Sequence, residues 1–122
     1  MKNKLFLSID PALLESMIKT NVHPYVYMAK YATRHFLELK DVTEHKFAMT
    51  FTSSLAAMVW MPNFAAYAGT KAHNYMLAKM LNQALFKSEK TRNLVDLQSL
   101  HPAGVSTNLN KFKRVEGQCV SA

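Results

Sequence analysis

The stretch Phe47-Ala48-Met49-Thr50-Phe51-Thr52-Ser53-Ser54 decides the fold when it is read with the segments that follow it. Residues 47–52 are short, β-prone and uncharged, as expected for a strand covered on both faces. Residues 64–87 are rich in Ala, Leu and Met and predict a long helix. Residues 94–100 predict a second strand, which stops at the turn-forming residues 101–104. A strand, a long helix and a strand make a βαβ unit with parallel strands, so the sequence predicts an α/β layered fold.

Two helical stretches precede this unit. Asp10 suits the N-cap of the first, and Pro11 suits its first helical position. Pro24 should interrupt the helix, because its ring clashes with the carbonyl four residues back and it has no N–H to donate. Helical spacing resumes over residues 25–39. We therefore expect one long helix with a kink near residues 21–24.

The composition limits the kind of protein this can be. A chain of 122 residues forms one domain at most. Its three glycines provide no Gly-rich turn, so neither a P-loop nor a G-x-G-x-x-G phosphate-binding motif is present. The single cysteine, Cys119, excludes an internal disulfide and fits a reducing compartment. Two predicted strands are too few for a stable parallel sheet. We therefore expect the predicted helices and strands to be part of a larger fold.

The charge and the histidines add little to this description. A net charge of +7 and a pI near 9.6 are compatible with nucleic acid, an anionic membrane or an anionic ligand. The basic residues are scattered except at residues 111–114, which favours a solvated face and a basic tail over a nucleic-acid site. No apolar run is long enough for a transmembrane helix, and the start lacks the apolar stretch of a signal peptide. The histidines lack ligand spacing, so no metal is predicted.

Three polar residues suggest proton transfer. Tyr67 and Lys71 are four apart on the predicted helix, so both project from one face. Ser54 follows the first strand, at the end where a parallel sheet presents its active groups. A neighbouring ammonium stabilises a phenolate and so lowers the pKa of a tyrosine, while a serine hydroxyl can hold the same substrate oxygen. The combination is typical of a site that interconverts a carbonyl and an alcohol.

These residues resemble the short-chain dehydrogenase/reductase family, over residues 13–109. Tyr67 and Lys71 match its Tyr-x-x-x-Lys motif, Ser54 falls at its catalytic serine, and Asn21 falls at its helix asparagine. The resemblance implies that Tyr67 is the general acid or base and that Lys71 lowers its pKa and binds the nicotinamide ribose. It implies further that Ser54 orients the substrate carbonyl. The backbone carbonyl of Asn21 would hold a water that leads protons to Lys71.

The segment after the second strand is also similar to the family. Pro102, Val105 and Thr107 match its Pro-Gly-x-Val-x-Thr pattern, with Ala103 in the glycine position. The resemblance implies that these residues, with Tyr67 and Lys71, contact the cofactor, which is NADP or NAD.

The apolar residues 55–64 lie between the serine and the tyrosine. In members of the family the corresponding segment borders the substrate. They favour an apolar carbonyl or alcohol such as a steroid, a retinoid or a fatty-acyl group. The hydroxysteroid dehydrogenase and 3-oxoacyl reductase branch is the more similar one, which implies steroid or lipid metabolism. The alternative is that these residues only pack against a neighbouring subunit or element.

The Gly-rich strand, turn and helix with which the family begins are missing before Asp10. Residues 1–122 are therefore expected to be a single partial domain that lacks the N-terminal dinucleotide-binding half. The implied architecture is the central-to-late half of a doubly wound, Rossmann-like fold, with long helices flanking a small parallel sheet. Because pyrophosphate binding needs close backbone approach at a helix N-terminus, we expect weak or no NAD(P)H binding by this chain alone.

Two functions follow from the resemblance. The first is an oxidoreductase sequence, as a fragment with weak or no activity alone. The second is a catalytically inactive module that pairs with full-length relatives, or with its own copies, through its two long helical segments. A small nucleic-acid binder ranks last because it rests on charge alone. The expected location is intracellular, in the cytoplasm, or on the endoplasmic reticulum surface if a missing N-terminal segment anchors the chain.

Overall fold

The computed structural model describes residues 6–39 and 46–104. Within them the chain forms three α-helices, two strands and three short 3-10 helices. In chain order these are η1 (Phe6–Ser8), α1 (Pro11–Asn21), α2 (His23–Leu39), β1 (Phe47–Thr52), η2 (Leu55–Ala57), η3 (Pro62–Phe64), α3 (Ala65–Lys87) and β2 (Val95–Leu100). None of the helices in these two segments is long and apolar enough to cross a membrane.

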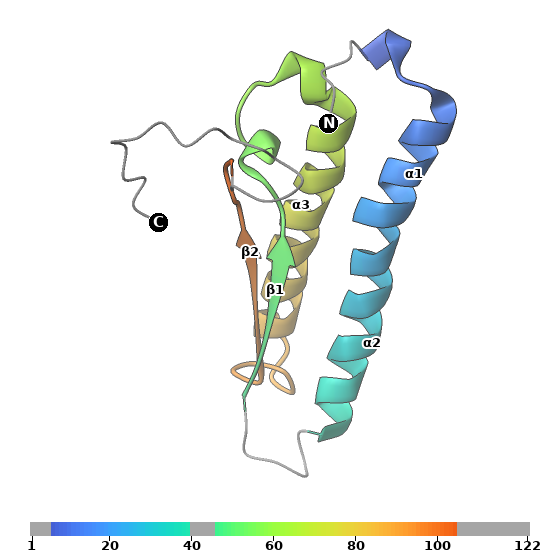
Figure 1. Cartoon of the computed structure of the whole chain (residues 1–122). Helices are drawn as coiled ribbons and strands as arrows, with labels where there is room; N and C mark the ends of the chain where they lie inside the picture. The colour runs from blue at the N-terminus through green and yellow to red at the C-terminus, as the bar shows by residue number, and fades with distance from the viewer. Residues whose placement is uncertain (1–5, 40–45, 105–122) are drawn as a thin grey trace, which may run out of the picture.

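Helices α1 and α2 form one long rod with a break at Val22 (Figure 1). The side chain of Asp10 accepts a hydrogen bond from the Ala12 N–H at 2.9 Å, and Pro11 occupies the first turn, as expected. Helical structure resumes at His23, two positions earlier than the spacing of apolar residues indicated. The kink expected at residues 21–24 is therefore confirmed.

The two strands pair in parallel, from Phe47 opposite Val95 to Thr52 opposite Leu100. Helix α3 connects them, and it runs beside the α1–α2 rod in the same direction (Figure 1). The βαβ unit and the α/β class are confirmed. Long helices beside a small parallel sheet are what a partial Rossmann-like fold contains.

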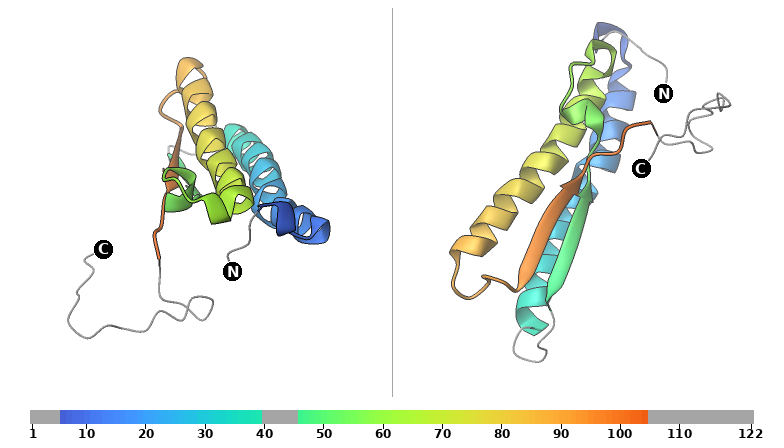
Figure 2. Two further views of the ribbon diagram at one scale, coloured as in Figure 1. Left: turned by 90° about the horizontal axis from the view of Figure 1, so that it is seen from above. Right: turned by 90° about the vertical axis from the view of Figure 1, so that its left-hand side faces the viewer.

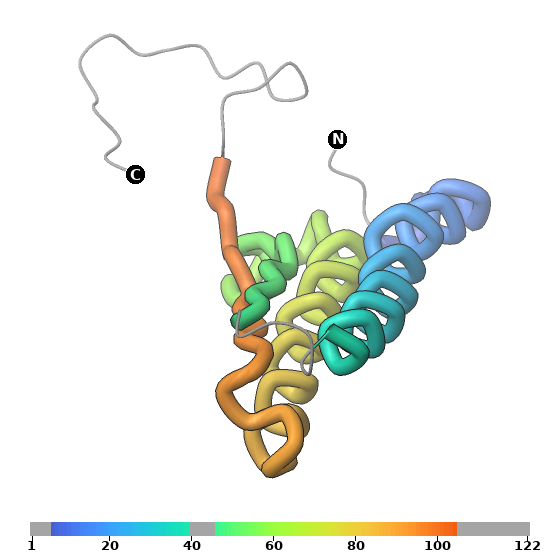
Figure 3. The backbone as a smooth tube through the Cα atoms, turned by 90° about the horizontal axis from the view of Figure 1, so that it is seen from below, coloured from blue at the N-terminus to red at the C-terminus, as the bar shows by residue number. Residues whose placement is uncertain are grey.

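The core lies between the sheet and the helices. Figure 2, in its right-hand view, shows the two strands in front of the helices, and Figure 3 shows the same layers from below. Alternate residues of each strand face this layer, and they bury their side chains against α2 and α3. The buried apolar residues there are Ala29, Phe51, Ala78, Val95 and Leu97.

The opposite face of the sheet is exposed, and the expectation of a strand covered on both faces is wrong for these residues. Ala48, Thr50 and Thr52 alternate with the buried positions of β1 and are all exposed. The physical reason is that α2 and α3 pack on the same side, so no described element covers the other. This face carries polar groups, and Gln98 Nε2 donates to Thr50 Oγ1 at 3.2 Å.

The outer edges of the two strands are partly occupied by side chains from α3. The main-chain N–H of Leu97 points away from β1 and donates to Asn82 Oδ1 at 2.9 Å. At the other edge, Lys71 Nζ donates to the main-chain oxygen of Thr52 at 3.2 Å. The middle of β2 and the end of β1 are therefore each tied to α3 by a polar side chain.

Candidate active site

The candidate site lies where both strands end, beside the first half of α3. The N–H of Ser53 donates to the Leu100 carbonyl at 2.8 Å, which extends the pairing one residue beyond the strands. The N–H of Leu55 then donates to the Pro102 carbonyl at 3.0 Å. The segments that follow β1 and β2 consequently run side by side, and they bring the serine segment next to Pro102.

Tyr67 and Lys71 lie together on α3. The Nζ atom of Lys71 is 5.8 Å from the centre of the Tyr67 ring. Lys71 is only 8% exposed, whereas Tyr67 is half-buried. Burial removes water from the ammonium and lowers the pKa of Lys71 from its ordinary value of 10.5. Its bond to the Thr52 carbonyl fixes this cation at the end of β1.

The two adjacent serines have different positions. Ser53 is 2% exposed, and its hydroxyl donates to the Lys71 main-chain oxygen at 2.7 Å. Ser54 is half-buried, and its Oγ accepts from the Ala56 N–H at 3.2 Å, so that it caps η2. Since Ser54 Oγ is the acceptor there, its own O–H can still donate to another oxygen. Ser53 thus fastens the strand end to α3, and Ser54 presents a donor beside it.

Asn21 joins the helix break to α3. It is the last residue of α1, and its Nδ2 donates to Thr70 Oγ1 at 3.2 Å. Thr70 Oγ1 in turn donates to the Tyr67 main-chain oxygen at 2.7 Å. The structure therefore places the Asn21 side chain against the residue that precedes Lys71. The role expected of its backbone carbonyl stays a prediction.

The expected cofactor contacts are only partly within the described residues. Pro102 follows β2 and is half-buried, while Val105 and Thr107 lie outside the described residues. Tyr67 and Lys71 provide a hydroxyl and an ammonium, which can hydrogen-bond to the hydroxyls of a ligand. Gly69 lies within α3, and no Gly-rich turn at a helix N-terminus occurs in the described segments, so they contain no pyrophosphate cradle.

Sequence reasoning missed three residues that surround this site. Thr70 and Asn74 follow Tyr67 by three and seven positions, a helical spacing that puts them near the same face and could have indicated them. Asn74 is fully buried, its Oδ1 lies 3.2 Å from His73 Nδ1, and its Nδ2 has no partner among the described residues. Tyr25, on α2, lies beside Lys71. No local pattern in the sequence indicates that last contact.

The apolar segment between Ser54 and Tyr67 buries Ala56 but leaves most of its large side chains exposed. Trp60 is 92% exposed, and other large apolar side chains of this segment are exposed as well, namely Leu55, Met58, Val59 and Met61. A separate cavity of about 280 Å³ lies between α2 and β1, lined by Pro24, Tyr25, Met28, Ala29, Met49, Thr50 and Phe51. This cavity adjoins the site through Tyr25, whose ring lies beside Lys71.

No cluster of three or more His, Cys, Asp or Glu side chains occurs in residues 6–39 and 46–104.

Neither the curated proteins nor the solved structures contain a match to this sequence. A family model described as short chain dehydrogenase does match, over residues 1–117. That match spans nearly the whole chain and includes the Tyr67–Lys71 pair and both strands. The chain belongs to the short chain dehydrogenase family.

Proposed function

We propose that the chain contributes the proton-transfer part of an NAD(P)-dependent oxidoreductase that interconverts carbonyls and alcohols. NAD(P)-dependent oxidation and reduction is the activity of the family as a whole. The observation that carries the proposal for these residues is the buried Lys71 ammonium next to the Tyr67 ring, at the carboxyl end of β1.

In this proposal the hydroxyl of Tyr67 gives a proton to the substrate oxygen in reduction and takes it back in oxidation. Lys71 places a positive charge next to the ring that carries that hydroxyl. Ser54 donates its O–H to the same substrate oxygen and fixes its direction. The carbonyl of Asn21, at the helix break, holds a water that connects Lys71 to solvent. The nicotinamide cofactor, when bound, supplies or accepts the hydride.

We assign the contacts to NADP or NAD to Tyr67 and Lys71 at the ribose and to Pro102, Val105 and Thr107 at the nicotinamide. Residues 1–122 are proposed to be a partial domain, without the dinucleotide-binding half. Because pyrophosphate is held by backbone N–H groups at a helix N-terminus, the chain alone should bind NAD(P)H weakly or not at all.

The substrate is proposed to be an apolar carbonyl or alcohol, of the kind handled by hydroxysteroid dehydrogenases and 3-oxoacyl reductases. This assignment is supported by the exposed apolar side chains between Ser54 and Tyr67, which offer a surface for a steroid or an acyl chain. Burying such a surface against an apolar substrate gains about 25 cal/mol per Å². An apolar substrate of this kind would belong to steroid or lipid metabolism.

The test combines cofactor titration with turnover. NADPH fluorescence should change little on addition of the chain, and binding in the micromolar range would contradict the partial-domain proposal. Turnover of apolar ketones at a high concentration of NAD(P)H should be slow and should disappear in Tyr67→Phe. The matched control is Tyr75→Phe, on the same helix, whose ring lies against His101 and Lys79. Turnover that survives Tyr67→Phe would exclude the assigned role of Tyr67.

A second candidate is an interaction module that pairs with full-length relatives or with its own copies. It is favoured by apolar side chains exposed on the helices, namely Leu13, Ile18, Val26, Tyr27, Met28, Tyr31, Met76 and Met80. Gel filtration of the chain mixed with a full-length family member tests it. Co-elution that is lost in the double variant Tyr27→Glu, Tyr31→Glu supports the module, and the absence of co-elution counts against it.

A further inference from the structure

The ammonium of Lys71 lies next to two phenol rings. Its Nζ is 5.8 Å from the centre of the Tyr67 ring and 5.8 Å from the centre of the Tyr25 ring. Tyr67 belongs to α3, like Lys71, whereas Tyr25 comes from α2, just after the helix break at Val22. Two elements that are distant in the sequence thus place aromatic rings around one buried cation.

Lys71 needs such neighbours, because burial opposes its positive charge. The ion pairs within the described segments join Lys19 to Glu15 and Arg34 to Glu38, so no carboxylate compensates Lys71 there. The groups that favour the charged form are the Thr52 carbonyl and the faces of the two rings. A desolvated cation gains more from an aromatic ring than an exposed one does.

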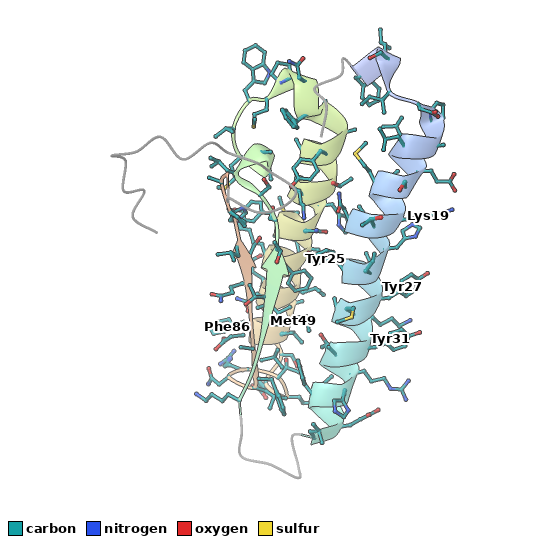
Figure 4. All side chains as sticks on the ribbon, in the orientation of Figure 1. Lys19, Tyr25, Tyr27, Tyr31, Met49 and Phe86 are labelled. Atoms are coloured by element: carbon teal, nitrogen blue, oxygen red, sulfur yellow. The ribbon has the colours of Figure 1, made fainter. Side chains whose placement is uncertain are left out.

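The position of Tyr25 is fixed by the core. Its ring packs on Phe51, with a centroid distance of 5.9 Å and an angle of 33° between the planes. Phe51 is 2% exposed. Tyr27 and Tyr31, on the same helix, are more than half exposed and lie on the outward side of α2 (Figure 4). Of these three tyrosines, Tyr25 is the one directed at the site.

We propose that Tyr25 is a positioning residue whose ring holds the Lys71 ammonium beside Tyr67. This inference rests on the proposed function, because Lys71 matters to proton transfer only in its charged form and next to the Tyr67 hydroxyl. Tyr25 itself need not touch substrate or cofactor. Its role is to stabilise the charged form of Lys71 and to cover the side of the ammonium that faces α2.

The test measures the pKa of Lys71 directly, by an NMR titration of its Cε signal in the whole chain with isotopically labelled lysine. The signal is assigned by its loss in Lys71→Arg. The titratable groups beside Nζ in the described segments are the phenols of Tyr25 and Tyr67. Tyr25→Phe keeps the ring, Tyr25→Leu removes it, and Tyr27→Leu makes the same change at an exposed position.

Tyr25→Leu should lower the pKa of Lys71 further, by roughly half a unit, because a ring that stabilised the cation is lost. Tyr25→Phe and Tyr27→Leu should leave it unchanged. An unchanged pKa in Tyr25→Leu would overturn the proposal. Equal shifts in Tyr25→Phe and Tyr25→Leu would overturn it too, because the hydroxyl and not the ring face would then be responsible.

A second series covers the case that Tyr25→Leu does not fold. Tyr25→Phe is made with phenylalanines of increasing ring fluorination, which weakens the negative ring face and alters the shape little. The pKa of Lys71 should fall stepwise along this series. A flat series would refute a role for the ring face. These measurements require no cofactor and no turnover, so their failure is distinct from a failure of the proposed oxidoreductase function.

Discussion

The hydroxyl of Ser53 donates to the main-chain oxygen of Lys71 over 2.7 Å, so the end of β1 is fastened to the turn of α3 that carries the cation. Ser53 is almost fully buried, and the bond joins residues that are far apart in the sequence. Ser53 is therefore expected to matter more for stability than its neighbour Ser54, which mutation can test.

Ser53→Ala should lower the free energy of unfolding by about 1 kcal/mol, the usual value of one buried hydrogen bond. Ser54→Ala should change it by less, because it removes only the cap of the short helix η2. Denaturant unfolding of both variants makes the comparison. If the two losses are equal, Ser53 does not have the fastening role.

Lys71→Met should change the pH dependence of stability. Burial lowers the pKa of Lys71 in the folded chain below its ordinary value of 10.5, so the unfolded chain binds more protons between the two values. Stability due to this residue therefore rises with pH in that window and is least below it. The difference in unfolding free energy between Lys71→Met and the unchanged chain should shrink as the pH rises towards 10.5.

The unfolding of both chains is followed over the alkaline range. Lys71→Arg serves as the control, since a guanidinium keeps its charge throughout. A difference that stays constant with pH would contradict the buried position of the ammonium.

Phe51→Ala should lower the free energy of unfolding by about 3–5 kcal/mol, as large-to-small substitutions of buried aromatic residues do. Phe51 is 2% exposed and belongs to the apolar cluster between the sheet and the helices. The matched control is Phe86→Ala, on the exposed side of α3, which should cost about 0.5 kcal/mol or less. Thermal unfolding followed by circular dichroism distinguishes them, and similar melting temperatures would place the core elsewhere.

Asn82→Ala should expose the outer edge of β2. Its Oδ1 is the acceptor for the Leu97 N–H, and losing this bond should cost about 0.5–1.5 kcal/mol. Hydrogen exchange at Leu97 should become faster, and the chain should aggregate more readily because a strand edge is unprotected. Gln83→Ala, at the neighbouring exposed position, is the control. Unchanged exchange at Leu97 would show that Asn82 does not protect this edge.

The parts of this fold that depend on local sequence were predictable. The Asp10 cap, the break before Pro24 and the four-residue spacing of Tyr67 and Lys71 each follow from residues within one or two helical turns. The parallel βαβ unit followed from the order of its segments. These features need no knowledge of which other elements are present.

The parts that depend on tertiary contacts were not predictable. The bond from Asn21 to Thr70 and the ring of Tyr25 beside Lys71 join helices that are separated by a strand in the sequence. The exposed face of β1 was mistaken for a covered one, because short uncharged strands look alike whether one or two layers pack on them. Neither propensity nor spacing contains that information.

The bond from Lys71 to the Thr52 carbonyl sets how many other acceptors the ammonium can serve. A lysine ammonium has three N–H groups, and this bond uses one of them without removing any charge. Two directions are left, and the proposed site has three acceptors for them, the oxygen of Tyr67, a ribose hydroxyl and the water held by the Asn21 carbonyl. In the proposed site these three acceptors therefore compete for two N–H groups, so the ammonium exchanges one partner for another during a catalytic cycle.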